Sequence, residues 1–140
     1  MKIAIRYFTR TGNTKKLAEA IAKEVNVEAL PVSEPITEDI DALFLASSVY
    51  GTGVASEVKS FLGDINVKVG EIVNVSSAAI IESTYAQIKK LAEMNNLKVS
   101  NHEYHCRGKF TLMHRGRPNI EDLDGAAKFA KSYIDHRTIQ

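Results

Sequence analysis

A run of polar residues able to bind an anion stands near the start of the sequence, between an apolar stretch and an amphipathic one. The run consists of Thr9, Arg10, Thr11, Gly12, Asn13 and Thr14. The start of a helix carries roughly half a positive charge and unpaired N–H groups, which together suit a phosphate. Gly12 lets the backbone bend close to the anion, and the hydroxyl and amide side chains add donors. The run therefore predicts a phosphate site that needs no lysine on the phosphate.

An ordinary helix cap is the alternative interpretation, because Ser, Thr and Asn are common just before helices. A lone threonine would favour that interpretation, whereas this six-residue cluster directly after a first strand favours the phosphate site. The run lacks the Gly-Lys-Ser/Thr ending of nucleoside-triphosphate loops and the spaced glycines of dinucleotide-binding loops. We therefore expect a phosphate of another class of ligand.

Strand-like and helix-like segments alternate along the chain and must position this loop. Apolar runs predict strands at 2–7, 27–32, 42–48, 71–79 and 98–106, and helical spacing predicts helices at 13–25, after Gly53, at 84–95 and from Asn119 onward. Thr84 and Gln87 have capping-box spacing, and Asp122 follows Asn119 as a capping signal. The alternation predicts one α/β domain over residues 1–140, with a parallel sheet covered by helices on both faces. In such sheets ligands bind beyond the carboxyl ends of the strands.

The segment Thr9-x-Thr11-Gly12-Asn13-Thr14 after an apolar strand resembles the FMN-phosphate loop of the flavodoxin family. The length, the order of elements and the segment Gly116–Leu123 are similar to those of small bacterial flavodoxin-domain proteins. The resemblance implies a flavodoxin-like three-layer sandwich, with a five-stranded parallel sheet in the order 2-1-3-4-5. It also implies FMN as the cofactor.

By the same resemblance, the loop after the third strand holds the flavin ring. Its residues are Ser48, Tyr50, Gly51, Thr52 and Gly53. Tyr50 would stack on one face of the ring. Gly51 resembles the family's glycine whose peptide turns toward the flavin N5 on reduction, a change that is cheap without a Cβ. The alternative is a half-buried loop tyrosine between simple turn glycines.

The loop after the fourth strand supplies, in this family, backbone groups to the pyrimidine edge of the flavin. Ser77, Ala78 and Ala79 stand at that place and are small enough for a close approach. The first half of this loop has no aromatic residue to serve as the second stacking partner. Tyr85, at the start of the following helix, is predicted to be a core or rim residue by its place on the apolar face.

Composition excludes several classes of function. The formal net charge of +1 and the absence of a strong basic block argue against binding nucleic acid through bulk charge. No apolar run is long enough to span a bilayer, and the opening residues 1–5 lack a signal-peptide cleavage region, so we expect a cytoplasmic protein. Strand alternation puts His102 and Cys106 on the opposite side from His105, so we expect no metal site.

These observations predict an FMN-binding electron carrier, acting as a monomer, that passes electrons between a reductase and a redox partner protein. An FMN-dependent quinone or NAD(P)H oxidoreductase is the alternative, and a flavin-free partner-binding module of the same fold is a third. The segments Ile5–Tyr7, Gly12–Lys16 and Cys106–Phe110 are similar to those of small flavodoxins encoded beside flavin-dependent reductases, such as the accessory flavodoxins of bilirubin reductases. The basic loop Arg107–Arg117 would lie near the flavin or dock the partner, or else be a solvated loop.

Overall fold

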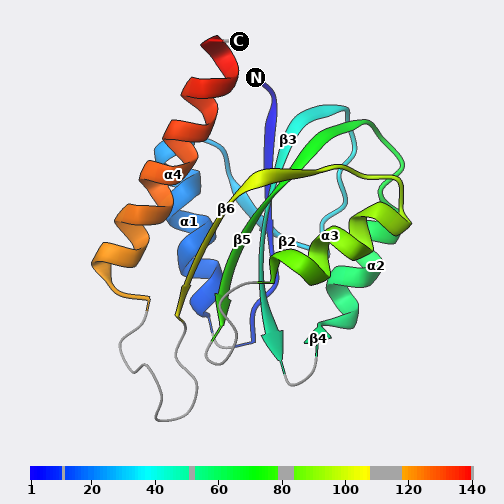
Figure 1. The fold of residues 1–140 in the computed structure, drawn as a ribbon, viewed down its shortest axis with the longest axis horizontal. Helices are drawn as coiled ribbons and strands as arrows, with labels where there is room; N and C mark the ends of the chain where they lie inside the picture. Colours follow the sequence, from blue (N-terminus) through cyan, green and yellow to red (C-terminus); the bar gives the residue numbers. More distant parts are fainter. Residues whose placement is uncertain (11, 51–52, 79–83, 108–117, 140) are drawn as a thin grey trace.

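A computed structural model of the chain describes residues 1–10, 12–50, 53–78, 84–107 and 118–139. Strands and helices alternate within these residues, as the sequence predicts (Figure 1). In chain order the elements are β1 (Ile3–Tyr7), α1 (Asn13–Val25), β2 (Ala29–Pro31), β3 (Ile40–Tyr50), β4 (Gly53–Val54), α2 (Ser56–Asp64), β5 (Val69–Ala78), α3 (Tyr85–Met94), β6 (Val99–Arg107) and α4 (Ile120–Ile139).

The main sheet is parallel and has the strand order β2-β1-β3-β5-β6. The short β4 stands apart from this path and pairs antiparallel with the end of β3. With β4 set aside, the observed order is the predicted order 2-1-3-4-5. The flavodoxin-like α/β fold is therefore confirmed.

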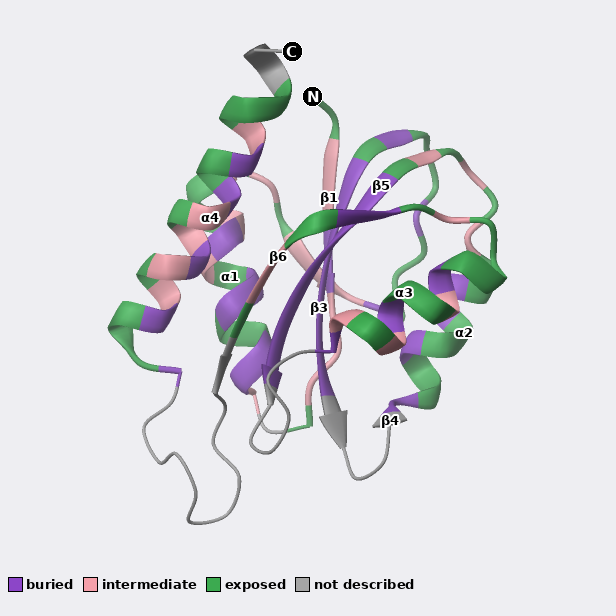
Figure 2. Ribbon diagram, in the orientation of Figure 1, coloured by how far each residue is buried: buried purple, intermediate pink, exposed green. Residues whose placement is uncertain are grey.

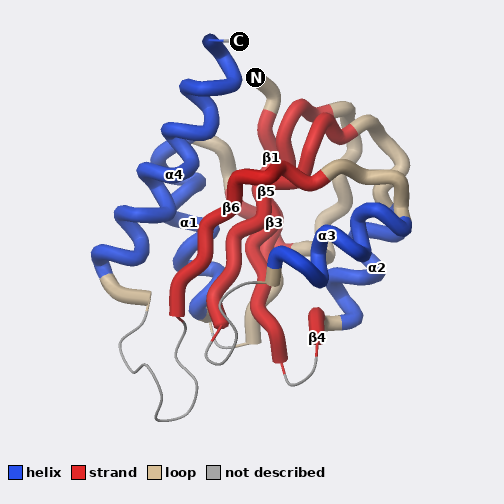
Figure 3. The backbone as a smooth tube through the Cα atoms, viewed as in Figure 1, coloured by secondary structure: helices blue, strands red, loops and turns tan. Residues whose placement is uncertain are grey.

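Helices cover both faces of the sheet, α1 and α4 on one side and α2 and α3 on the other (Figures 1 and 3). Alternate residues of β3 enter two separate cores because successive side chains of a strand point to opposite faces. Leu43 and Leu45 join the cluster beneath α2 and α3, whereas Phe44 and Ala46 join the cluster beneath α1 and α4. The central strands are buried on both faces (Figure 2), which explains the near-continuous apolar run of the third predicted strand.

The observed bounds differ from the predicted ones where local turns decide them. Helix α1 has the predicted bounds, but β2 is shorter than the predicted strand at 27–32. Asn26 adopts a left-handed conformation with φ of 57° that ends α1, and the N–H of Val27 still donates to the carbonyl of Ala22, 3.1 Å away. The chain therefore enters β2 two residues later. β3 is longer than predicted and β4 was not expected.

The two predicted capping signals have opposite outcomes. At the start of α4, the N–H of Asn119 donates to Asp122 Oδ2 at 2.8 Å and the N–H of Asp122 donates to Asn119 Oδ1 at 2.9 Å, so this signal is confirmed. The capping box at Thr84 and Gln87 is wrong, since the side chain of Thr84 makes no capping bond to the described turn of α3. Its hydroxyl contacts Asn74 on β5 instead.

Candidate functional site

The predicted phosphate loop joins the carboxyl end of β1 to the start of α1. Gly12 has φ of 90°, a left-handed conformation that glycine adopts without strain, and its N–H donates to Thr9 Oγ1 at 2.8 Å. The hydrogen bond from Lys16 N–H to Gly12 O, 3.2 Å long, stands at the start of the helix and has the i to i−4 spacing of its backbone bonds. The N–H groups of the first helical turn precede this bond and point out of the helix end. A turn of this shape presents amide donors to the space beyond the sheet.

Electrostatics and space at this helix start also suit an anion. The first turns of α1 and α3 contain no acidic residue, whereas the first turns of α2 and α4 carry Glu57 and Glu121. Acidic residues in a first turn would compete with a bound anion for the helix dipole. An added Cβ at Gly12 would meet no described atom within 4 Å, so the glycine borders open space.

Three predicted site residues, one each from α1, β3 and β5, meet in a row of hydroxyl groups. Thr14 Oγ1 lies 2.9 Å from Ser48 Oγ, which lies 3.3 Å from Ser77 Oγ. Thr14 is fully buried, and Ser48 and Ser77 are nearly so. The row ties the first turn of α1 to the ends of β3 and β5. The structure thus brings together the phosphate loop and the two loops predicted to hold the ring.

The remaining members of the phosphate loop occupy different environments. Asn13 is buried, and Thr9 is half-buried. Arg10 is exposed, with its guanidinium carbon 5.8 Å from the centre of the Phe8 ring. Thr11 lies outside the described residues.

The loop predicted to hold the flavin face begins as a hairpin. Val49 pairs with Val54 and Tyr50 pairs with Gly53 across the antiparallel contact of β3 and β4. Gly51, Thr52 and the side chain of Tyr50 lie outside the described residues, as does Ala79, while Ala78 ends β5. The roles of Tyr50 and Gly51 toward a flavin therefore stay predictions.

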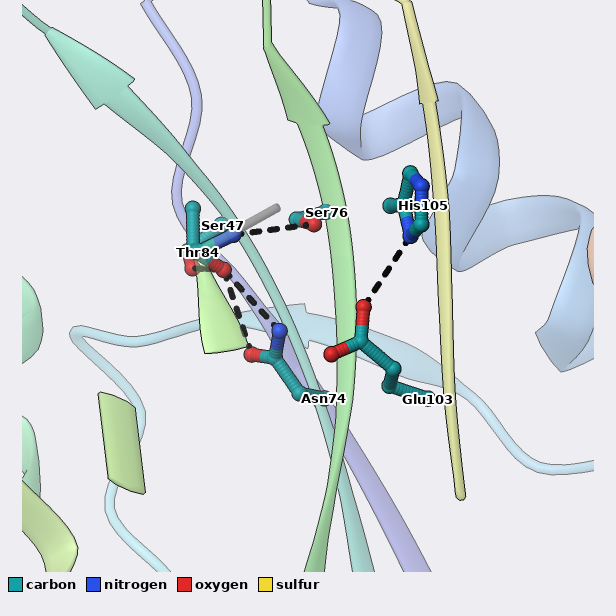
Figure 4. Close-up of polar contacts among 6 residues, drawn as sticks. All are labelled: Ser47, Asn74, Ser76, Thr84, Glu103 and His105. Carbon is teal, nitrogen blue, oxygen red and sulfur yellow. Dashed lines mark hydrogen bonds and ion pairs between the residues drawn. The ribbon is translucent and has the colours of Figure 1, made fainter. Parts of the chain in front are cut away.

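A buried polar cluster that the sequence analysis missed lies beside this edge (Figure 4). Asn74 Nδ2 is 3.0 Å and Asn74 Oδ1 is 3.3 Å from Thr84 Oγ1. The N–H of Thr84 donates to Ser76 Oγ at 3.3 Å, and Ser47 Oγ lies 3.5 Å from Thr84 Oγ1. Asn74 is a lone amide within the apolar run of β5, and this interruption was the available signal.

Tyr85 and the edge strand β6 complete the surroundings of the site. Tyr85 is partly buried and packs against the core beneath α2 and α3, so its predicted core or rim position is confirmed. On β6, His105 Nδ1 lies 3.0 Å from Glu103 Oε1 (Figure 4). Within the described parts of the chain, no group of three or more His, Cys, Asp and Glu residues could hold a metal ion.

A groove of 310 Å³ lies at the opposite end of the sheet, between the start of β6 and the end of α4. Glu71, Ser100 and Tyr133 are among its lining residues. The predicted cofactor residues lie at the carboxyl ends of the strands, away from this groove. Among the helices of the described ranges, none has the length and apolar character needed to cross a membrane.

Comparison with known proteins agrees with this geometry. Residues 4–104 match the family described as the flavodoxin domain. Because this match covers most of the chain, the protein belongs to the flavodoxin domain family. No curated protein sequence matches it.

Solved flavodoxin structures have the same fold. A flavodoxin from the domain Archaea superposes with a TM-score of 0.75 at 17% identity, over 93% of this chain and 94% of that one. Flavodoxin 2 from Bacillus cereus gives 0.69 at 15% identity, over 97% and 99% of the two chains. The two-electron reduced flavodoxin of Megasphaera elsdenii gives 0.61 at 20% identity, over 92% and 98%. At these identities the likeness establishes the fold.

Proposed function

We propose that this protein binds FMN at the carboxyl edge of its sheet and carries electrons between a reductase and a redox partner protein. The observation that carries the proposal is the left-handed Gly12 turn at the acid-free start of α1, tied by Thr14 to the ends of β3 and β5. Membership of the flavodoxin domain family supports the same function.

The predicted site residues would each bind a different part of the cofactor. Backbone amides and hydroxyls of residues 9–14 would hold the phosphate, because a helix start without acidic residues attracts a dianion. Residues 48, 50–53 and 77–79 would surround the ring. The flavin supplies the electron-transfer chemistry when bound, and the protein supplies binding, orientation and electrostatics.

An electron carrier is favoured over an enzyme with its own substrate site. The polar groups at the edge are mostly bonded to each other: Thr14, Ser48 and Ser77 in one row, and Asn74 and Thr84 in the neighbouring cluster. Side chains bonded to each other in this way hold the surrounding segments in place, which is the part that a protein plays toward a bound flavin. We propose that the protein acts as a monomer and meets its partners, the electron donor and the acceptor, at the cofactor edge.

Titration of the apo-protein with FMN and with riboflavin, followed by flavin fluorescence, tests the proposal. FMN should bind at least about tenfold more tightly, because it alone carries the phosphate, and inorganic phosphate should weaken FMN binding only. Equal affinities would contradict the assigned phosphate loop, and binding of neither flavin would favour the flavin-free module. Steady oxidation of NAD(P)H by the loaded protein alone would favour the oxidoreductase alternative.

A further inference from the structure

We propose that Asn74 and Thr84 are a positioning pair that holds the start of α3 against β5 and thereby sets the ring-binding side of the site. The proposal rests on the proposed function, since it concerns the affinity for flavin. Neither residue is assigned a contact with the cofactor. Their role is to fix the chain on either side of residues 79–83.

The first argument is the burial of the pair. Both side chains are fully buried, on the sheet face where Leu43, Leu45 and Ile72 belong to the core beneath α2 and α3. Burying an amide in such surroundings is unfavourable unless its groups are hydrogen-bonded. The amide of Asn74 meets this need by presenting both Nδ2 and Oδ1 to one hydroxyl, that of Thr84 (Figure 4).

The second argument is the number of bonds that converge on Thr84. Its hydroxyl contacts Asn74, its N–H donates to Ser76 Oγ, and its carbonyl accepts the N–H of Ile88 at 3.0 Å. A serine or threonine just before a helix normally uses its hydroxyl oxygen to accept a hydrogen bond from a backbone N–H of the first helical turn. Thr84 uses its hydroxyl for the sheet instead, which fixes the position of α3 relative to β5.

The third argument is the place of the pair relative to the hydroxyl row. Ser76 accepts the hydrogen bond from the N–H of Thr84. The next residue, Ser77, is the last member of the hydroxyl row that runs from Thr14 through Ser48. The start of α3 is thus tied to the part of β5 that also meets the phosphate loop. An apolar pair of the same volume would lack directional hydrogen bonds. The polar pair therefore fixes the position of α3 relative to β5 as well as contributing to stability.

Substitutions at Thr84 separate location from stability. Thr84→Val keeps the shape and removes the hydroxyl, and Thr84→Ser keeps the hydroxyl. We expect Thr84→Val to weaken the binding of FMN and of riboflavin by the same factor of about ten. It should also shift the midpoint potential of the bound flavin. Thr84→Ser should bind both flavins nearly as the wild type does. Equal factors for both flavins mark an effect on the ring side, because a fault in the phosphate loop affects FMN alone.

Two controls account for loss of stability. Ile88→Val removes one methylene from a fully buried residue of the same helix and keeps both the backbone bond to Thr84 and the hydroxyl–amide contacts of the pair, so its urea midpoint should fall while its flavin affinities hold. The double variant Asn74→Leu/Thr84→Val replaces both polar partners by apolar groups, so it should keep a urea midpoint near that of the wild type. It should nevertheless bind both flavins more weakly and keep the shifted potential.

The outcomes decide between the two proposals. If the wild type binds FMN and the double variant binds both flavins with wild-type affinity and potential, the positioning role is wrong and the proposed function stands. The positioning role is also wrong if Ile88→Val, at the same loss of stability, weakens flavin binding as much as Thr84→Val does. Failure of the wild type to bind any flavin defeats the proposed function itself, and the positioning role with it.

Discussion

The phenol of Tyr133 on α4 donates a hydrogen bond to the carboxylate of Glu71 on β5, and Arg137 lies 3.1 Å from the same carboxylate oxygen. Glu71 is almost completely buried. The contact joins α4 to the sheet at the amino ends of the strands, and the candidate site lies at the carboxyl ends of the same strands. Burial, together with the hydrogen bond and charge of Glu71, raises the pKa of Tyr133 well above its usual value.

The raised pKa of Tyr133 predicts a loss of stability at alkaline pH. The folded protein holds the phenol proton more tightly than the unfolded chain, so this contribution is complete below the ordinary tyrosine pKa of about 10 and declines as pH rises above it. The free energy of unfolding in urea should fall between about pH 9 and about pH 11 more steeply for the wild type than for Tyr133→Phe. Equal slopes in the two proteins would show that the proton of Tyr133 is not linked to folding.

Gly12→Ala should destabilise the fold by about 1 kcal/mol, because alanine is strained at a φ of 90°. The affinity for FMN should also fall, and more than the affinity for riboflavin, since the turn is assigned to the phosphate. Gly63→Ala is the matched control. Gly63 lies in α2, where an added Cβ would have Asn95 Oδ1 as its nearest neighbour at 3.9 Å, and alanine there should stabilise by about 0.5 kcal/mol. A Gly12→Ala protein as stable as the wild type would contradict the left-handed turn.

Gly125 in α4 should resist the alanine substitution that normally favours a helix. A Cβ there would lie 2.6 Å from the hydroxyl oxygen of Tyr104, which donates to the carbonyl of Asp122 at 2.7 Å. Gly125→Ala should therefore destabilise the wild type and do so less in a Tyr104→Phe background, where the hydroxyl is gone. A double-mutant cycle in urea measures the coupling between the two sites, and additive effects would contradict the contact.

Much of the fold could be predicted because the pattern that sets it is local. Helix α1 has the predicted bounds since Leu17, Ala18 and Ile21 repeat at helical spacing and are fully buried. The strand at 42–48 was evident since both of its faces are covered. The strand order came with the resemblance to flavodoxins rather than from any spacing in the sequence.

Features that depend on contacts between distant segments could not be predicted. The capping box at Thr84 had the right spacing, but Asn74 from the neighbouring strand takes the hydroxyl. β4 has two residues and no pattern of its own, since it forms only by pairing with the end of β3. The candidate site shows the same division. The run from Thr9 to Thr14 was recognisable, whereas its link to Ser48 and Ser77 arises because the start of α1 packs against the ends of β3 and β5.

The oxygens of Thr14, Ser48 and Ser77 each carry a rotatable proton, and each can donate or accept across its contact. The chain of contacts can therefore run in either direction without displacement of a heavy atom. A negative charge arriving at one end is then screened by reorientation of small dipoles, while the backbone stays where it is. The three hydroxyl groups can therefore respond to a charge at this edge while the heavy atoms of Thr14, Ser48 and Ser77 keep their positions.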